Sequence, residues 1–77
     1  MKVEVLGTGC PKCKKTEAVI RGVLAKLQLE AEVVDVTDIN QIMARGVMMT
    51  PAVFVDGVKV MEGKVPSEAE AAAFLRK

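Results

Sequence analysis

Short apolar runs alternate with amphipathic segments along the chain, and this alternation predicts a mixed α/β domain. The apolar runs are rich in Val and are typical of short strands; they cover residues 2–6, 31–36, 52–55 and 58–61. After the first run, apolar residues recur at helical spacing, so we expect a helix from Pro11 to Gln28. Pro11 suits the first helical position, where its missing N–H is not needed.

A second, shorter helix is expected between the second and third apolar runs. Thr37 or Asp38 can cap its N-terminus, and Gly46 stands where a C-terminal cap belongs. The residues predicted to face inward are Ile39, Ile42 and Met43.

The second half of the chain carries two strong local signals. Asp56-Gly57 separates two apolar runs, which predicts a tight hairpin. Ser67, with Glu70 three residues later, forms a capping box for a last helix that ends at Leu75. The predicted order is therefore β-α-β-α-β-β-α. A right-handed crossover makes the first two strands parallel, and the hairpin adds an antiparallel pair, so we expect a four-stranded mixed sheet with helices on both faces.

Size and composition narrow the class of protein. The 77 residues are enough for one domain, residues 1–77, with a modest core, and 51% of them are hydrophobic. The net charge is +1 and the chain has no Trp or Tyr, which argues against a nucleic-acid binder. No segment has the pattern of a signal peptide or a bilayer span, so no membrane association and a cytoplasmic location are expected.

The chain has two cysteines, and their spacing indicates redox or metal chemistry. Cys10 and Cys13 lie at the predicted start of the first helix, where backbone N–H groups and the helix dipole stabilise a thiolate. Lys12, Lys14 and Lys15 add positive charge over the same turn. The alternative for these lysines is an ordinary solvated surface.

Two motifs together resemble the thioredoxin/glutaredoxin superfamily. They are Cys10-Pro11-Lys12-Cys13 after the first strand and Thr50-Pro51 before the hairpin, and the resemblance covers essentially the whole chain. The short chain is most similar to the small thioredoxin-like redox-active disulfide proteins of archaea and bacteria. The resemblance implies a thioredoxin-like fold and a monomeric thiol–disulfide oxidoreductase that exchanges two electrons with protein disulfides. It implies no cofactor and no metal ion.

The resemblance also assigns roles at the dithiol. Cys10 is expected to be the nucleophile and Cys13 the resolving cysteine, which attacks the mixed disulfide. Glu4 lies six positions before Cys10, at the spacing of a buried acid that accepts a proton in thioredoxins. The alternative is that Glu4 points past the sheet edge into water.

Residues near the second motif are expected to bind substrate. The Thr50-Pro51 peptide bond is implied to be cis, which would leave the Thr50 backbone open to pair with an extended substrate segment. Met49 and Lys12 are the further candidate substrate-binding residues. Met48 and Met49 can offer a soft apolar rim to partners, although at least one of the two is expected to fill the core.

Departures from the family pattern bear on the electron donor. The segment Gly63–Ser67 replaces the pattern that helps to hold glutathione in glutaredoxins, so a thioredoxin-reductase-type donor is expected. Two other functions remain open. One is a Cu(I)-binding module with a CxxC pair, although such domains run β-α-β-β-α-β and usually carry Met where this chain has Thr8. The other is a redox-sensing adaptor with the same disulfide chemistry but little turnover.

Overall fold

The computed structural model describes residues 1–9 and 11–76, and these residues form the seven predicted elements in the predicted order. Cys10 and Lys77 lie outside the described residues. The elements are β1 (Lys2–Leu6), α1 (Pro11–Leu27), β2 (Glu32–Val36), α2 (Ile39–Ala44), β3 (Ala52–Val55), β4 (Val58–Glu62) and α3 (Glu68–Leu75).

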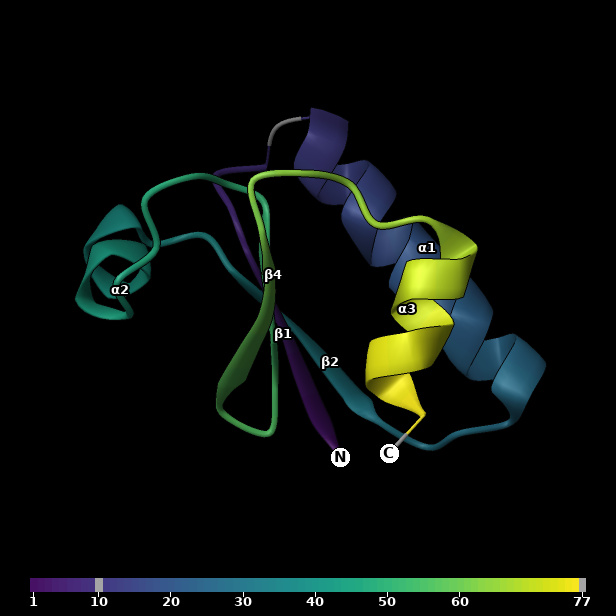
Figure 1. The fold of residues 1–77 in the computed structure, drawn as a ribbon. Coiled ribbons are helices and arrows are strands. Elements are labelled where there is room, and N and C mark those ends of the chain that lie inside the picture. The colour runs from purple at the N-terminus through teal and green to yellow at the C-terminus, as the bar shows by residue number, and fades with distance from the viewer. Residues whose placement is uncertain (10, 77) are drawn as a thin grey trace.

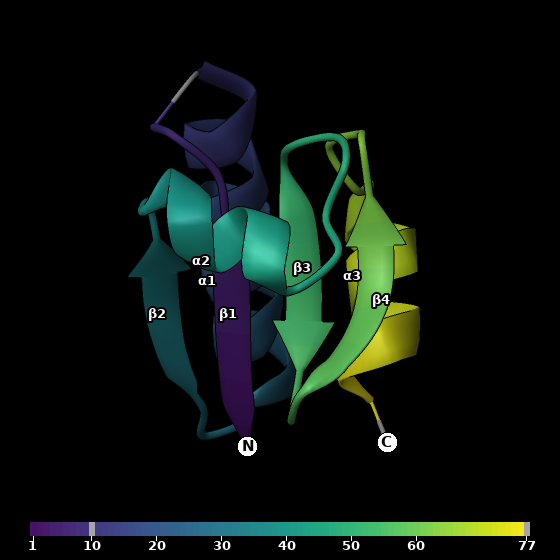
Figure 2. The same ribbon diagram turned by 90° about the vertical axis from the view of Figure 1, so that its left-hand side faces the viewer.

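The four strands form one mixed sheet in the order β2-β1-β3-β4 (Figure 2). β1 is parallel to β2 and antiparallel to β3, and β3 pairs with β4 in an antiparallel hairpin. Helices α1 and α3 cover one face of this sheet and α2 covers the other (Figure 1). The predicted fold, with helices on both faces, is therefore confirmed.

Alternation along β1 divides the core between the two faces of the sheet, because successive strand residues point to opposite sides. Val3 and Val5 belong to the larger core, which lies under α1 and α3. Leu6 belongs to the smaller core, which lies under α2 and includes Phe54. The larger core is wholly aliphatic in its buried residues: Val3, Val5, Ile20, Val23, Leu24, Val53, Val55, Ala71 and Leu75.

The inward face of α2 differs from the prediction. Ile42 is buried, whereas Ile39 is 58% exposed and Met43 is 67% exposed. The helix has six residues, which is fewer than two turns. Val47, from the segment that follows, packs in the same core as Ile42. Helix α2 and this segment therefore cover the smaller core together. Two of the three residues predicted to face inward, Ile39 and Met43, are exposed instead.

Local start and stop signals in the sequence are confirmed. Asp38 caps α2 and accepts a hydrogen bond from the Asn40 N–H at 2.8 Å. Ser67 and Glu70 form the capping box of α3. Gly46 follows α2 with φ of +76°, the left-handed conformation that ends many helices.

The hairpin and the end of α1 also depend on left-handed residues. Asp56 and Gly57 have φ of +50° and +85°, as a tight two-residue turn requires. Gln28 has φ of +54°, so α1 ends at Leu27, one residue before the predicted end.

The start of the first helix and the described chain termini lie at opposite ends of the molecule. The start of α1 and the loop before β3 lie at one end, and the described termini lie at the other (Figure 1).

Candidate active site

Cys13 lies in the first turn of α1 and is packed against the end of β1. Its exposed fraction is 6%. A Cβ placed on Gly7 would overlap the Cys13 Sγ and lie 3.1 Å from the Cys13 Cβ. The Gly7 N–H donates to the Val36 carbonyl at 2.9 Å, which holds this backbone beside β2. Only a residue without a side chain fits at Gly7, so the glycine permits the close approach of the thiol to the sheet. Cys10, the predicted nucleophile, lies outside the described residues.

The loop before β3 also approaches Gly7. The Thr50-Pro51 peptide bond is cis, as the sequence resemblance implied. The Thr50 Cβ lies 3.8 Å from the position that a Cβ on Gly7 would take. Pro51 is among the fully buried residues. The fold therefore places the second cysteine and the Thr50-Pro51 loop around one glycine, although they are far apart in the sequence.

The end of β4 fixes this loop from outside. The Glu62 carboxylate accepts hydrogen bonds from the Met48 N–H at 2.6 Å and the Met49 N–H at 3.1 Å. Lys59 Nζ donates to the same carboxylate at 2.7 Å. The Lys59 hydrogen bond, followed by the two backbone hydrogen bonds, lowers the pKa of Glu62 to about 2. Glu62 is thus an ionised anchor for the backbone before Thr50, a role that no local sequence pattern indicates.

Met48 and Met49 are surface residues, which corrects the expectation that one of them fills the core. Met48 is 92% exposed and Met49 is 62% exposed. The Met49 side chain lies against Gly63, with its Cβ 3.3 Å from the position of a Cβ there. The Gly63 N–H in turn donates to the Pro51 carbonyl at 2.8 Å. Both side chains are thus at the surface, on a backbone that Glu62 holds in place.

A cavity of about 150 Å³ lies beside Cys13. Two acidic side chains share its wall with the cysteine. Glu17 lies one turn after Cys13 on α1, and Asp35 lies on β2, where it is paired with Val5 of β1. The lining residues are Val5, Gly7, Gly9, Cys13, Lys14, Glu17, Asp35 and Thr37.

The two carboxyls perturb one another in opposite directions. Burial, followed by the hydrogen bond with Glu17 and the negative charge of Glu17, raises the pKa of Asp35. The hydrogen bond from Arg21, 2.7 Å from Nε to Oε2, lowers the pKa of Glu17, and the hydrogen bond with Asp35 lowers it further. Two carboxyls in contact disfavour simultaneous ionisation, and Asp35 is the one whose protonated form is favoured. This pair can take up or release a proton beside Cys13.

Glu4 lies on the opposite face of the sheet. It is 6% exposed, which rules out the alternative that it points into water. Arg45 binds it with both terminal nitrogens, Nη1 to Oε1 at 2.9 Å and Nη2 to Oε2 at 2.5 Å. The Arg45 Cζ also lies 5.3 Å from the centroid of the Phe54 ring. The hydrogen bonds from Arg45 outweigh burial and lower the pKa of Glu4. The geometry does not support Glu4 as the proton acceptor for Cys13, because its carboxylate is already committed to Arg45 on the α2 side.

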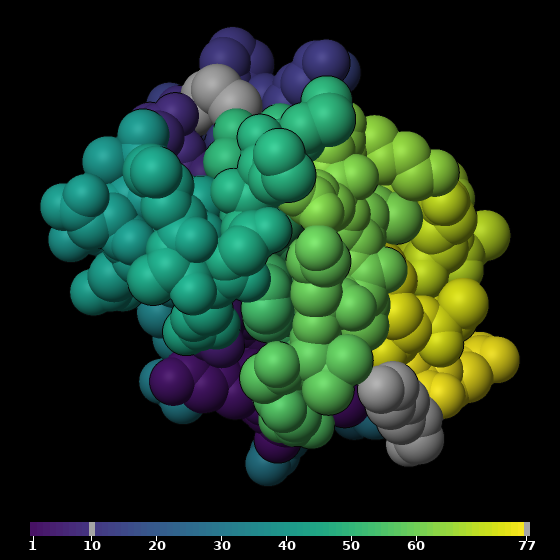
Figure 3. Space-filling model, turned by 60° about the vertical axis from the view of Figure 1, so that its left-hand side comes forward, coloured from purple at the N-terminus to yellow at the C-terminus, as the bar shows by residue number. Residues whose placement is uncertain are grey.

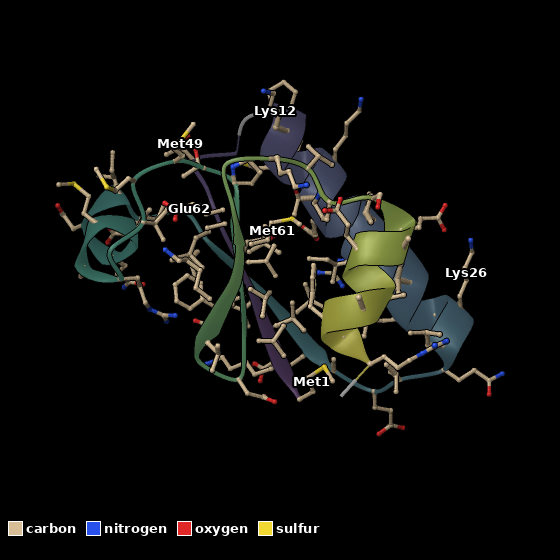
Figure 4. All side chains as sticks on the ribbon, in the orientation of Figure 1. Met1, Lys12, Lys26, Met49, Met61 and Glu62 are labelled. Carbon is tan, nitrogen blue, oxygen red and sulfur yellow. The ribbon has the colours of Figure 1, made fainter. Side chains whose placement is uncertain are left out.

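Unpaired positive charge gathers at the start of α1. Lys12, Lys14 and Lys15 are exposed, and none of the ion pairs among residues 1–9 and 11–76 involves them. Lys12 lies at the same end of the molecule as Met49, whereas Lys26 lies toward the far end of α1 (Figure 4). This placement keeps both predicted substrate-binding residues, Lys12 and Met49, at the end that carries Cys13.

Within residues 1–9 and 11–76, no three His, Cys, Asp or Glu side chains are grouped as a metal site. Over the same part of the chain, no helix combines the length and the apolar character needed to span a bilayer.

A cysteine at the start of the first helix, packed beside a cis-proline loop on this sheet topology, defines the thioredoxin-like class of proteins. Comparison with known proteins agrees. The thioredoxin domain family matches residues 1–76. Thioredoxin from Methanocaldococcus jannaschii is 46% identical over 68 residues, which cover 88% of this chain and 78% of that protein. Thioredoxin from Methanothermobacter thermautotrophicus is 33% identical over 70 residues, or 91% of each chain. The chain belongs to the thioredoxin family, and it is a thioredoxin-like thiol–disulfide oxidoreductase.

The sequence reasoning missed the acidic pair beside Cys13. A signal for Glu17 was present, because residues four apart on a helix lie on one face and Glu17 is four residues after Cys13. No comparable signal marked Asp35, because its place in the cavity depends on how β2 is aligned with β1.

Proposed function

We propose that the chain reduces disulfides of target proteins through Cys10 and Cys13. The observation that carries this proposal is the packing of Cys13 against Gly7, directly beside the cis Thr50-Pro51 loop. In the same proposal, the protein acts as a cytoplasmic monomer and receives its electrons from a thioredoxin-reductase-type flavoprotein.

The exchange proceeds in two steps. The Cys10 thiolate attacks one sulfur of the target disulfide, the target S–S bond breaks, and the released target thiolate takes a proton from solvent. Cys13 then loses its proton and attacks the Cys10 sulfur of the mixed disulfide. The second target thiolate leaves and is protonated, and the Cys10–Cys13 disulfide remains. Two electrons have passed from the protein to the target.

The start of α1 supports the first step. Unpaired backbone N–H groups and the positive end of the helix dipole favour an anion at this position. Lys12 and Lys14 add charge of the same sign. The Thr50 backbone is positioned to pair with an extended target segment, as in strand addition. Met49 and Lys12 then lie at the rim of the contact.

The cavity beside Cys13 supports the second step. In place of Glu4, we assign the proton from Cys13 to the pair of Asp35 and Glu17, which lines this cavity. Asp35 receives the proton, because burial and the neighbouring carboxyl favour its protonated form. Arg21 keeps Glu17 ionised and so maintains the asymmetry of the pair.

Two cysteine variants test the proposal on a protein disulfide such as insulin. Cys10→Ser removes the nucleophile, so turnover should be lost and no adduct should form. Cys13→Ser leaves the nucleophile but removes the resolving thiol, so mixed disulfides should accumulate and be visible by non-reducing electrophoresis and mass spectrometry. If adducts form with Cys10→Ser and not with Cys13→Ser, the order of attack is reversed.

The same assay separates the two remaining functions. A redox-sensing adaptor would form the Cys10–Cys13 disulfide but reduce insulin poorly. A Cu(I)-binding module would bind the metal tightly and show no turnover. The β-α-β-α-β-β-α order differs from the β-α-β-β-α-β order of such modules, so thiol exchange is favoured over metal delivery.

A further inference from the structure

Exposed apolar side chains are concentrated on one segment beside the active site. Six large hydrophobic residues are exposed among those described, and four of them lie between residues 39 and 49. These four are Ile39, Met43, Met48 and Met49. Flexible, polarizable methionines suit a surface that adapts to different partners. In the space-filling view, this segment and the start of α1 border the same end of the molecule (Figure 3).

A groove of about 310 Å³ runs through this apolar surface toward Thr8 and Thr50. Its floor is apolar and buried, formed by Ile42 and Val47. Its inner wall holds Thr8 and Thr50, and the Thr50 Cβ lies 3.8 Å from the Cβ position at Gly7, where Cys13 also packs. The groove therefore leads from α2 to the reacting end of the protein.

The other side of this end is basic. Lys12, Lys14 and Lys15 are exposed on the first turns of α1 and have no ion-pair partner in the part of the chain described. Five of the ten acidic residues are paired with a basic side chain: Glu4, Glu17, Glu62, Glu68 and Glu70. Near the groove, Glu62 is bound by Lys59 and two backbone N–H groups, and Asp38 caps α2. The three lysines thus have no ion-pair partner among the described residues at the reacting end, although the acidic Asp35 lines the same cavity as Lys14.

We infer that the groove and the three lysines together form a docking surface for an extended target segment of defined polarity. The segment carries the disulfide between an aliphatic residue, which enters the groove beside α2, and acidic residues, which face Lys12, Lys14 and Lys15. This inference rests on the proposed function and names the class of substrate that this site prefers. Charge complementarity across such a contact raises the association rate more than the affinity of the complex.

The test uses four synthetic peptides, each with one intramolecular disulfide. They combine Leu or Ser on one side of the disulfide with Glu-Glu or Lys-Lys on the other. Reduced protein is mixed with each peptide, and the second-order rate constant is measured by acid quench and thiol alkylation. The acidic peptides should react about 10-fold faster or more than the basic ones at low ionic strength. That ratio should collapse in ~1 M salt, where the screening length falls to about 3 Å.

The charged half of the surface is tested by removing its lysines. The variant K12Q/K14Q/K15Q should bring the ratio of acidic to basic rates close to one. The matched control is K2Q/K26Q/R76Q, which removes the same amount of charge toward the opposite end of the molecule, where the described termini lie (Figure 1), and should retain the ratio. The ratio is the readout because the lysines also affect the thiolate itself and thus the rates with every peptide.

The apolar half is tested by M43S/M48S, which should remove the preference for Leu over Ser. V58T, a change at an exposed apolar residue on β4, is its control and should keep the preference. If all four peptides are reduced at equal rates at low salt, the docking inference is wrong while the proposed function stands. If none is reduced, the proposed function itself fails. A ratio that survives in K12Q/K14Q/K15Q also overturns the inference.

Discussion

Two acidic residues on neighbouring strands occupy opposite faces of the sheet and behave in opposite ways. Glu4 on β1 is paired with Val34 of β2, and Asp35 is the next residue along that strand. Glu4 is buried and its pKa is lowered, whereas Asp35 is more exposed and its pKa is raised. The hydrogen bonds from Arg45 outweigh burial at Glu4, whereas at Asp35 burial raises the pKa first and Glu17 adds to it.

The acidic residues on the two faces of the sheet have different partners. On the α2 face, the ion pair of Glu4 and Arg45 fastens the C-terminal end of α2 to the central strand. On the α1 face, Asp35 and Glu17 leave a proton-binding pair beside Cys13. We therefore propose the less buried pair, and not the most buried acid, as the proton acceptor.

Glu4→Gln should produce the largest change in stability. It removes a charged partner from Arg45, and losing such charge-assisted hydrogen bonds should lower the free energy of unfolding by about 1.5–3 kcal/mol. Because folding lowers the pKa of Glu4, the ion pair stabilises the protein above the ordinary pKa of 4.5 and its contribution is lost as pH falls below that value. Urea denaturation should therefore show the gap between wild type and variant narrowing in acid. A gap of constant size down to strongly acidic pH would contradict this account of Glu4.

Gly7→Ala tests the close packing on the α1 face. The new Cβ would overlap the Cys13 Sγ, and overpacking of this kind should cost about 1–3 kcal/mol. In a Cys10→Ser background, alkylation of Cys13 should also become faster, because the thiol is displaced from the sheet. Gly22→Ala is the matched control, since a Cβ there meets nothing within 4 Å and should stabilise α1 by about 0.5–1 kcal/mol. Equal stability of the two variants would show that Gly7 is not a packing constraint.

Asp35→Asn should have the smallest effect on stability and the opposite sign to Glu4→Gln. At neutral pH it removes repulsion between two partly solvated carboxylates, a gain of about 0.2–1 kcal/mol. Folding raises the pKa of Asp35, so its protonated form is favourable in acid and that contribution is lost as pH rises through the folded-state pKa. The gain from Asn should thus appear at neutral pH and vanish in acid in thermal unfolding. Glu30→Gln, at an exposed residue, controls for net charge.

The parts of the fold that were predictable from sequence depend on local chemistry. Asp56-Gly57 and the capping box of Ser67 and Glu70 specify their own backbone, and the structure has them as expected. The outward orientation of Met43 and the pairing of Glu4 with Arg45 depend on how α2 lies across the sheet. No local pattern encodes that placement, so both were missed.

The residues of the candidate site were likewise predictable only where a short local motif specifies them. Cys13 and the cis Thr50-Pro51 bond were predictable because each belongs to a short motif with a fixed place in the chain. Asp35 was not, because only the parallel register of β1 and β2 brings it opposite Val5 and over the cavity. The sequence resemblance directed attention to Glu4, whose spacing is right but whose side chain faces α2.

The most direct test of this account is a single-turnover reaction of the reduced protein with a peptide disulfide at neutral pH. Acid quench and thiol alkylation would measure the mixed disulfide over time in wild type, Glu4→Gln and Asp35→Asn. We predict that the mixed disulfide accumulates in Asp35→Asn and resolves about 10²-fold more slowly, the usual contribution of a positioned proton acceptor. Glu4→Gln should resolve it at the wild-type rate. Accumulation in Glu4→Gln and not in Asp35→Asn would contradict the account.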